Sequence, residues 1–370
     1  MSKRIILGLI IILSLIGTLI LLLLTTVFKN VLDNGEARFV QHVILFEGES
    51  DASFRGLHAI NDSVVVVGGN HGLFGFSVDA GMHWNIQQIP ESGESQFRSV
   101  WALNDKEFLA VSAGAPTYIY HTDTRGQQWR RVFTDTAQST FLDGVVFVND
   151  SIGYIYGDPV DGRFKLLRTA DGGRSWNEIE GPEAIDGEAS FAASGSAITV
   201  GNNIMSIVSG GTVSRLHVTM DLRDGLGWTP SYIDIAQGTP SQGAFAHFWD
   251  KEKLYIVGGD YMSEENTYRT SLVADLMTGQ DDTATMTKLA NLPYTSDVCG
   301  DGEYIFFTGT TGMRYLDSAL HMMDTTAMHA LAFSGKYVFS AGPQGRIGRV
   351  FNGTKEELNE LLGELKNRDK

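Results

Sequence analysis

Residues 77–84, 122–129 and 169–176 read SVDAGMHW, TDTRGQQW and TADGGRSW. Each segment has a hydroxyl residue first, then an aspartate or threonine, a glycine and a tryptophan at matching positions, and the copies are 45 and 47 residues apart. An aspartate and a hydroxyl can hold a tight hairpin by binding its backbone, while glycine supplies a positive φ and tryptophan a large apolar surface. We therefore interpret these segments, called boxes below, as structural turns of a repeated unit.

Short apolar runs bounded by glycine recur along the same region, whereas helical periodicity is nearly absent between Arg38 and Phe351. Seven runs occur, namely VVVVGG at 64–69, FLAVSAG at 108–114, IGYIYGD at 152–158, AITVGN at 197–202, LYIVGGD at 254–260, YIFFTGT at 304–310 and YVFSAGP at 337–343. A repeat of about 45 residues with four strands is typical of the blade of a β-propeller.

The last repeat offers only three strands, near 328–333, 337–340 and 346–351. The stretch FVQHVILF at 39–46 is the expected fourth strand, because it would join the two ends of the chain and remove an exposed sheet edge. We therefore predict an all-β, seven-bladed β-propeller over residues 38–351, in preference to six or eight blades.

Composition excludes several classes of protein. Of the 370 residues, 42 are glycine and only 19% are charged, which is not the composition of a disordered or coiled-coil chain. The formal net charge of −16 repels phosphate backbones, so we expect no nucleic-acid partner. Cys299 is the single cysteine and permits neither an internal disulfide nor a thiolate zinc site. No metal-binding or cofactor-binding motif is present, so we expect neither metal nor cofactor.

The N-terminal residues 5–28 are uncharged and largely aliphatic. A helix of this length exceeds a hydrocarbon core of about 30 Å, so it can span a membrane. Lys3 and Arg4 favour a cytoplasmic N-terminus. We predict an uncleaved transmembrane anchor at 1–29, a linker at 30–37, and a propeller on the periplasmic or extracellular side. A cleaved signal peptide and a buried core helix are the alternatives.

The C-terminal residues 352–370 are predicted to form a short amphipathic helix. Thr354 and Glu357 have the spacing of a capping box. The helix would place four leucines on one face, namely Leu358, Leu361, Leu362 and Leu365. Such a face either packs on the propeller or binds a partner, and the sequence leaves both open.

The loops opposite the boxes contain the candidate binding residues. Boxes mark the turn between the third and fourth strands of a blade, so the loops between the second and third strands and between blades reach the other end. The candidates there are Arg55, Arg98, Asp158, Asp161, Arg163, Glu188, Arg215, Asp260 and Arg346. Arginines that converge on one funnel would bind a carboxylate or sugar acid bidentately. The alternative is that each arginine pairs with a nearby carboxylate and only holds its loop.

Several motifs together resemble those of a known group. They are SFRGL at 53–57, GDPVDGRF at 157–164, TADGGRSW at 169–176, GEASFAASG at 187–195, SRL at 214–216, VGGDY at 257–261 and GRIG at 345–348. This set resembles a bacterial group of Asp-box (BNR-repeat) propellers related to the photosystem II stability and assembly factor family. Members of the group often have oxidoreductase or glycosyl hydrolase labels.

The resemblance implies a non-enzymatic scaffold that holds a membrane-protein intermediate through an arginine-bearing face. The matching arginines would be Arg55, Arg98, Arg163, Arg215 and Arg346. We therefore expect a membrane-anchored scaffold outside the cytoplasm that binds a membrane-associated protein or a small acidic ligand. No redox residue supports an oxidoreductase.

The alternative function is a sialidase-like glycoside hydrolase acting on acidic glycans. Phe54 and Arg55 are similar to the Phe-Arg start of sialidases, which share the Asp-box. Asp158 and Glu188 would be the carboxylate pair, and their separation would decide the mechanism. The sequence names no catalytic residue beyond this pair.

Overall fold

The computed structural model describes residues 38–275 and 285–368. Residues 41–351 form one compact body. The predicted anchor at 1–29 and the linker at 30–37 lie outside the described residues. Within the described ranges, no helix is both long enough and apolar enough to cross a membrane.

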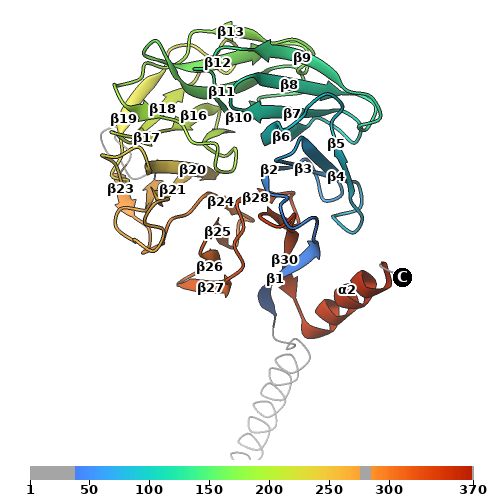
Figure 1. Cartoon of the computed structure of the whole chain (residues 1–370). Coiled ribbons are helices and arrows are strands. Elements are labelled where there is room, and N and C mark those ends of the chain that lie inside the picture. The colour runs from blue at the N-terminus through green and yellow to red at the C-terminus, as the bar shows by residue number, and fades with distance from the viewer. Residues whose placement is uncertain (1–37, 276–284, 369–370) are drawn as a thin grey trace, which may run out of the picture. The chain divides into compact units, whose positions relative to one another are not determined.

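Seven antiparallel sheets surround a central channel and form the blades of the body (Figure 1). Blades 1 and 2 contain β2 (Phe54–Ala59), β3 (Val65–Gly69), β4 (Leu73–Ser77) and β5 (Asn85–Gln88), then β6 (Gln96–Ala102), β7 (Phe108–Ala113), β8 (Thr117–Thr122) and β9 (Arg130–Asp135). Blades 3 and 4 contain β10 (Leu142–Phe147), β11 (Gly153–Val160), β12 (Arg163–Thr169) and β13 (Asn177–Ile179), then β15 (Ile198–Gly201), β16 (Ile204–Val208), β18 (Arg215–Thr219) and β19 (Thr229–Tyr232).

The remaining blades follow the same order. Blades 5 and 6 contain β20 (Gln242–Asp250), β21 (Lys253–Asp260), β22 (Ser271–Asp275) and β23 (Thr285–Lys288), then β24 (Asp297–Gly300), β25 (Ile305–Gly309), β26 (Gly312–Leu316) and β27 (Leu320–Asp324). Blade 7 contains β28 (Ala330–Phe333), β29 (Val338–Ala341), β30 (Ile347–Gly353) and β1 (Phe39–Phe46). Two short strands, β14 (Glu188–Ala189) and β17 (Gly210–Gly211), join the sheet of blade 5 through β20.

The ring closes as the sequence predicted. The first strand of every blade contacts the first strands of both neighbouring blades, and β28 of blade 7 contacts β2 of blade 1. In blade 7, β1 lies beside β30 in the sheet order β1-β30-β29-β28. The N-terminal strand therefore supplies the fourth strand of the last blade, and the seven-bladed propeller is confirmed.

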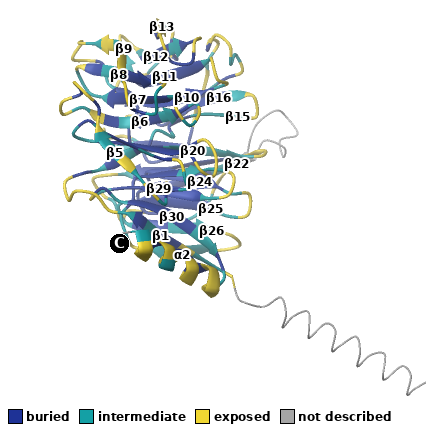
Figure 2. Cartoon of the chain, turned by 90° about the vertical axis from the view of Figure 1, so that its right-hand side faces the viewer, coloured by how far each residue is buried: buried dark blue, intermediate teal, exposed yellow. Residues whose placement is uncertain are grey.

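Close packing between blades explains the glycines in the apolar runs. A Cβ at Gly68 would lie 2.5 Å from Val100 Cγ1 and 2.7 Å from the Phe97 carbonyl oxygen of blade 2. At Gly201 of blade 4, a Cβ would lie 2.6 Å from Trp249 Cβ of blade 5. Only glycine fits where neighbouring blades approach so closely. Figure 2 shows the buried strands inside the body and the exposed connections at its edges.

The boxes form the expected turns between third and fourth strands. In the third box, the Gly173 N–H donates to Thr169 Oγ1 (2.9 Å), and the Ser175 N–H donates to Asp171 Oδ1 (2.9 Å). Trp176 is buried, and its Nε1 donates to the Gly173 carbonyl oxygen (3.1 Å). These bonds explain why the hydroxyl, the acid, the glycine and the tryptophan have the same spacing in the repeated boxes of this chain.

Thr124 takes the place of the aspartate in the second box without loss of the turn. Its Oγ1 accepts a hydrogen bond from the Gln128 N–H at 2.8 Å. A fourth turn precedes Trp228, whose Nε1 donates to the Gly225 carbonyl oxygen (2.8 Å). There, Asp221 fills the acid position, because Asp221 Oδ1 accepts from the Asp224 N–H at 3.0 Å.

The C-terminal helix α2 (Lys355–Arg368) begins with the predicted capping box. The Thr354 N–H donates to Glu357 Oε2 (2.8 Å), and the Glu357 N–H donates to Thr354 Oγ1 (3.3 Å). Three of the four predicted leucines are buried, namely Leu358, Leu361 and Leu365. What this face binds in the cell stays a prediction.

Candidate binding funnel

A cavity of about 420 Å³ opens at the end of the channel opposite the boxes. We call it the funnel and define it by its charged residues Arg55, Arg98, Asp143, Asp158 and Glu264. Arg55 lies near the start of β2 and Arg98 near the start of β6, so the two first strands bring them to the same mouth. Aromatic side chains form much of the wall, namely Phe141, Phe191, Phe245, Tyr261 and Tyr294.

The two arginines in the funnel are incompletely paired. Arg98 donates to Gln96 Oε1 from Nε (3.1 Å) and Nη2 (2.7 Å), and its guanidinium lies 5.9 Å from the centre of the Phe141 ring. Among the described residues, Arg55 has neither a hydrogen bond nor an ion pair. Burial lowers the pKa of Arg55, because a partly desolvated guanidinium holds its charge less favourably. An unpaired guanidinium there favours an anionic ligand.

Two carboxyl groups share Ser190 at the base of the funnel. The Ser190 N–H donates to Asp158 Oδ1 (3.0 Å), and the Ser190 hydroxyl contacts Asp143. Burial raises the pKa of Asp143 well above its usual range, and the neighbouring Asp158 raises it further. Burial also raises the pKa of Asp158. Both carboxyl groups line the funnel together with the two arginines.

The buried oxygen of Asp143 is another open position in the funnel. Asp143 is 1% exposed, and its Oδ1 has no hydrogen-bond partner among the described residues. Buried polar atoms in proteins nearly always have a partner. The funnel thus offers arginine donors and a buried acceptor to one ligand, a combination that suits a carboxylate accompanied by N–H or O–H groups.

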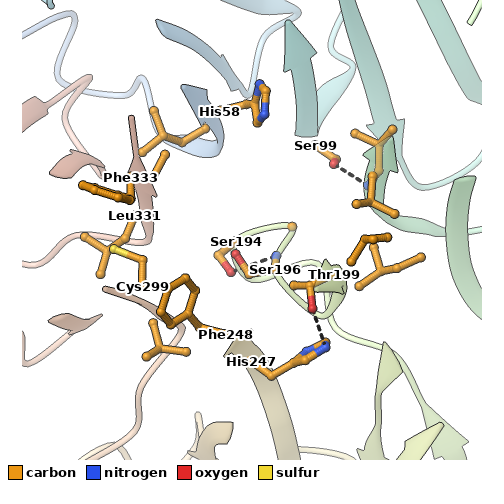
Figure 3. A pocket seen from close by; sticks show the side chains of 18 of the residues that line it. His58, Ser99, Ser194, Ser196, Thr199, His247, Phe248, Cys299, Leu331 and Phe333 are labelled. Atoms are coloured by element: carbon orange, nitrogen blue, oxygen red, sulfur yellow. Dashed lines mark hydrogen bonds between the residues drawn. The ribbon is translucent and has the colours of Figure 1, made fainter. Parts of the chain in front are cut away.

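Residues 190–196 separate the funnel from a second cavity further along the channel. Ser190 to Ala193 line the funnel, whereas Ser194 to Ser196 line the second cavity of about 440 Å³. Figure 3 shows that His247 and Thr199 lie next to each other on one side of that cavity, and that His58 lies on the opposite side. Burial lowers the pKa of His247 to about 3, and its Nε2 lies 2.8 Å from Thr199 Oγ1. His247 is therefore a neutral structural residue.

The predicted candidates divide into two groups in the structure. Arg55, Arg98 and Asp158 come together in the funnel, as expected. Arg163 and Arg215 line a different cavity of about 440 Å³ next to Trp228. The five arginines were expected to converge on one funnel. In the structure, two of them line the funnel and two line the other cavity.

Local partners explain why the other candidates do not reach the funnel. Arg163 Nη2 lies 3.0 Å from both Glu180 and Glu183 carboxylate oxygens. Arg346 Nε lies 3.0 Å from Glu47 Oε1. The remaining two candidates are held in turns: Asp260 Oδ1 accepts from the Met262 N–H (2.9 Å), and Asp161 has a positive φ of 52°. Their role in binding stays a prediction.

Glu188 lies in a buried network outside the funnel. Its carboxylate binds the Arg215 guanidinium bidentately, with Nε of Arg215 at 3.0 and 3.1 Å from the two oxygens. His217 Nε2 lies 3.0 Å from Oε1, and the Ser209 hydroxyl also donates to it. Glu188 and Asp158 therefore do not face one cavity, so the carboxylate pair required for the glycosidase alternative is not assembled.

Sequence reasoning missed several funnel residues. Asp143 lies within the apolar strand β10, and Tyr294 and His329 lie outside any recognised motif. The sequence contained one sign that Asp143 is functional: it is a charged residue near the start of a first strand that is otherwise apolar. Within the part of the chain that the structure describes, no group of three or more His, Cys, Asp or Glu residues is arranged to hold a metal ion.

The fold and the funnel define this protein as a seven-bladed β-propeller with an arginine-bearing cavity at one end of its channel. No protein-family model matches the chain. Its sequence is similar to that of the photosystem II assembly lipoprotein Ycf48 of Synechococcus sp. (strain CC9902), with 25% identity over 158 residues. The match covers 41% of this chain and 46% of that relative, so this chain matches about half of the relative's length. The predicted resemblance to the photosystem II assembly factor group is confirmed.

Solved structures share the fold at low sequence identity. YCF48 bound to D1 peptide has a TM-score of 0.60 at 12% identity and covers 84% of this chain and 96% of its own. YCF48 from Cyanidioschyzon merolae has a TM-score of 0.59 at 12% identity, covering 84% and 98%. A catalytically inactive virginiamycin B lyase from Staphylococcus aureus with quinupristin has a TM-score of 0.59 at 16% identity, covering 85% and 99%. These likenesses concern the fold alone.

Proposed function

We propose that this protein is a non-enzymatic binding scaffold whose funnel holds an acidic group of a partner protein. The observation that supports this most directly is Arg55, which lacks a partner among the described residues and stands beside Arg98 in the funnel. Guanidinium groups bind carboxylates through paired hydrogen bonds. A propeller of this fold has been solved with a bound peptide, and the sequence is similar to that of an assembly protein.

Binding, and not bond cleavage, is the better account of the funnel. Asp158 and Asp143 both accept hydrogen bonds from Ser190, so each carboxyl group already has a partner within the protein. Glu188, the second carboxylate of the glycosidase alternative, is buried against Arg215. A receptor for an anion needs only fixed donors, which Arg55 and Arg98 supply. A small acidic ligand would meet the same donors.

Loss of either funnel arginine is expected to weaken binding of acidic peptides by about 1 to 3 kcal/mol, because a charged hydrogen bond is lost. The measurement is fluorescence anisotropy of the full chain in detergent with labelled peptides rich in aspartate and glutamate. Peptides with asparagine and glutamine in their place should bind weakly. The variants are Arg55→Ala and Arg98→Ala, and Arg55→Lys should retain part of the affinity because it keeps the charge but not the planar fork.

Arg346→Ala is the matched control, since Arg346 is already paired with Glu47 and lies outside the funnel. It should bind acidic peptides like the unmodified chain. Equal binding of acidic and amide peptides, or unchanged binding in the Arg55→Ala, Arg98→Ala double variant, would rule out the funnel as the receptor.

We also propose that the scaffold is anchored in a membrane by residues 1–29, with the propeller outside the cytoplasm. The support is the uncharged stretch 5–28 and the basic residues Lys3 and Arg4 before it. A reporter fused after Lys370 should be active only when it is exported. A soluble mature form that begins near Asn30 would contradict the anchor.

A further inference from the structure

We infer that the partner segment continues from the funnel onto an apolar strip formed by Tyr261, Met262 and Tyr268, and so carries apolar residues beside its acidic group. The inference rests on the proposed function, because the funnel supplies the first contact. It concerns the loop between β21 and β22, and it specifies an extended polypeptide as the occupant.

The strip is unusually exposed for its residue types. Met262 is 75% exposed, Tyr268 65% and Tyr261 42%, and all three belong to one loop. Single exposed apolar residues are common, but three within eight positions of one loop favour an interaction surface. Tyrosine and methionine are enriched in protein interfaces, whereas such side chains gain nothing by facing water. The Tyr268 ring lies 5.1 Å from the Arg269 guanidinium, and Tyr261 packs against Phe245, yet all three side chains keep an exposed surface.

Hydrogen bonds hold the loop in one conformation. The Met262 N–H donates to Asp260 Oδ1 (2.9 Å), and the Tyr268 N–H donates to Asn266 Oδ1 (2.9 Å). At the end of the loop, Arg269 Nε lies 2.9 Å from Asp234 Oδ1. A surface held in place loses less conformational entropy on binding, so its contacts contribute more fully to affinity.

An aromatic wall connects the strip to the funnel arginines. The Tyr261 ring lies 6.2 Å from that of Phe245, which lies 5.1 Å from the Tyr294 ring. Tyr294 and Arg55 both line the funnel. The Glu264 carbonyl oxygen accepts from the Tyr294 N–H at 2.8 Å, which fixes the loop to the funnel wall. An extended chain advances about 3.3 Å per residue, so a bound segment reaches the strip within a few residues of its acidic group.

These contacts favour a polypeptide over a sugar acid or another small anion. A small anion would be satisfied by Arg55 and Arg98 and would not reach Met262 or Tyr268. A peptide has a carboxylate for the arginines, backbone N–H groups for Asp143 Oδ1, and side chains for the strip. The partner is therefore an extended segment with an acidic residue followed or preceded closely by leucine-like or aromatic residues.

The test uses two sets of labelled acidic peptides on the full chain in detergent. In one set leucines flank the acidic residue, and in the other serines do. We expect the leucine peptides to bind the unmodified chain about tenfold more tightly. In Tyr268→Ser and Met262→Ser, that ratio should fall to about threefold or less. Met220→Ser is the control, since Met220 is 82% exposed on the turn between β18 and β19, and it should keep the full ratio.

The outcomes separate this inference from the proposed function. Acid-dependent binding with the same leucine preference in Tyr268→Ser and in the unmodified chain overturns the strip and leaves the funnel intact. Acid-dependent binding by the unmodified chain without any preference for the leucine peptides also overturns the strip and leaves the funnel intact. No binding by any acidic peptide overturns both. A leucine preference lost only in the strip variants, with arginine dependence retained, supports both.

Discussion

Replacement of Glu188 by alanine is expected to lower the free energy of unfolding by about 3 to 5 kcal/mol, because it leaves a buried cation without its anion. The Glu188 and Arg215 side chains are almost fully buried and bind each other directly. His217 and Ser209 also donate to the carboxylate, so one substitution breaks several bonds. Chemical denaturation of the full chain in detergent measures the loss, and Glu183→Ala, in an exposed ion pair, should cost about 1 kcal/mol or less.

The same network has a defined pH dependence. Burial acts to raise the pKa of Glu188, but hydrogen bonds from His217, Arg215 and Ser209 outweigh burial and lower the pKa from 4.5 to about 2. A lowered pKa of an acid in the folded state stabilises the fold above the unfolded pKa, and this contribution is lost as pH falls toward the folded pKa. The stability gap between the unmodified chain and Glu188→Gln should therefore narrow from pH 4.5 to about pH 2. A constant gap would show that Glu188 is not ionised in the fold.

Trp176→Ala is expected to cost about 3 to 5 kcal/mol of stability, because it leaves a cavity where a large aromatic side chain was buried. Trp176 is 7% exposed and packs edge-on against Phe147, with ring centres 6.1 Å apart. It also donates to the Gly173 carbonyl oxygen and so closes the third box. Differential scanning calorimetry should show a lower melting temperature.

The control for Trp176→Ala is peptide binding by the remaining folded protein. The third box lies at the turn between β12 and β13, away from the funnel mouth formed by the starts of β2 and β6. Affinity for acidic peptides should therefore be unchanged. A variant that melts normally but no longer binds would show that the box is a binding element and not a structural turn.

The repeat could be predicted from the sequence because the interactions that form each box are made between residues close together in the chain. In each box the hydroxyl, the aspartate or threonine, the glycine and the tryptophan lie within eight residues. In the third box, the bonds among Thr169, Asp171, Gly173 and Trp176 are made inside that segment. Strand spacing then predicts the number of blades, and the missing fourth strand of the last repeat predicts the partner of β30. The fourth turn was harder, because extra residues separate Asp221 from Gly225 and shift the pattern.

Only some of the funnel residues could be predicted from the sequence. Arg55, Arg98 and Asp158 were predicted because they stand at the ends of recognisable strands that lead to one mouth. Arg163 and Arg346 share those features in sequence, yet each pairs with a nearby carboxylate. Spacing along the chain does not say whether a guanidinium pairs with a glutamate from another part of the sequence, as Arg346 does with Glu47.

The sequence by itself determined the all-β repeat, the seven blades and the closing strand, since these depend on short-range patterns of glycine, apolar residues and turns. Only the tertiary structure decided which charges remain unpaired. Among the described residues, Arg55 has no ion-pair partner whereas Arg215 is paired with Glu188, because blades 1 and 4 place the two arginines differently relative to carboxylates. Electrostatic pairing depends on distances in space of a few ångströms, and those distances exist only after the ring has closed.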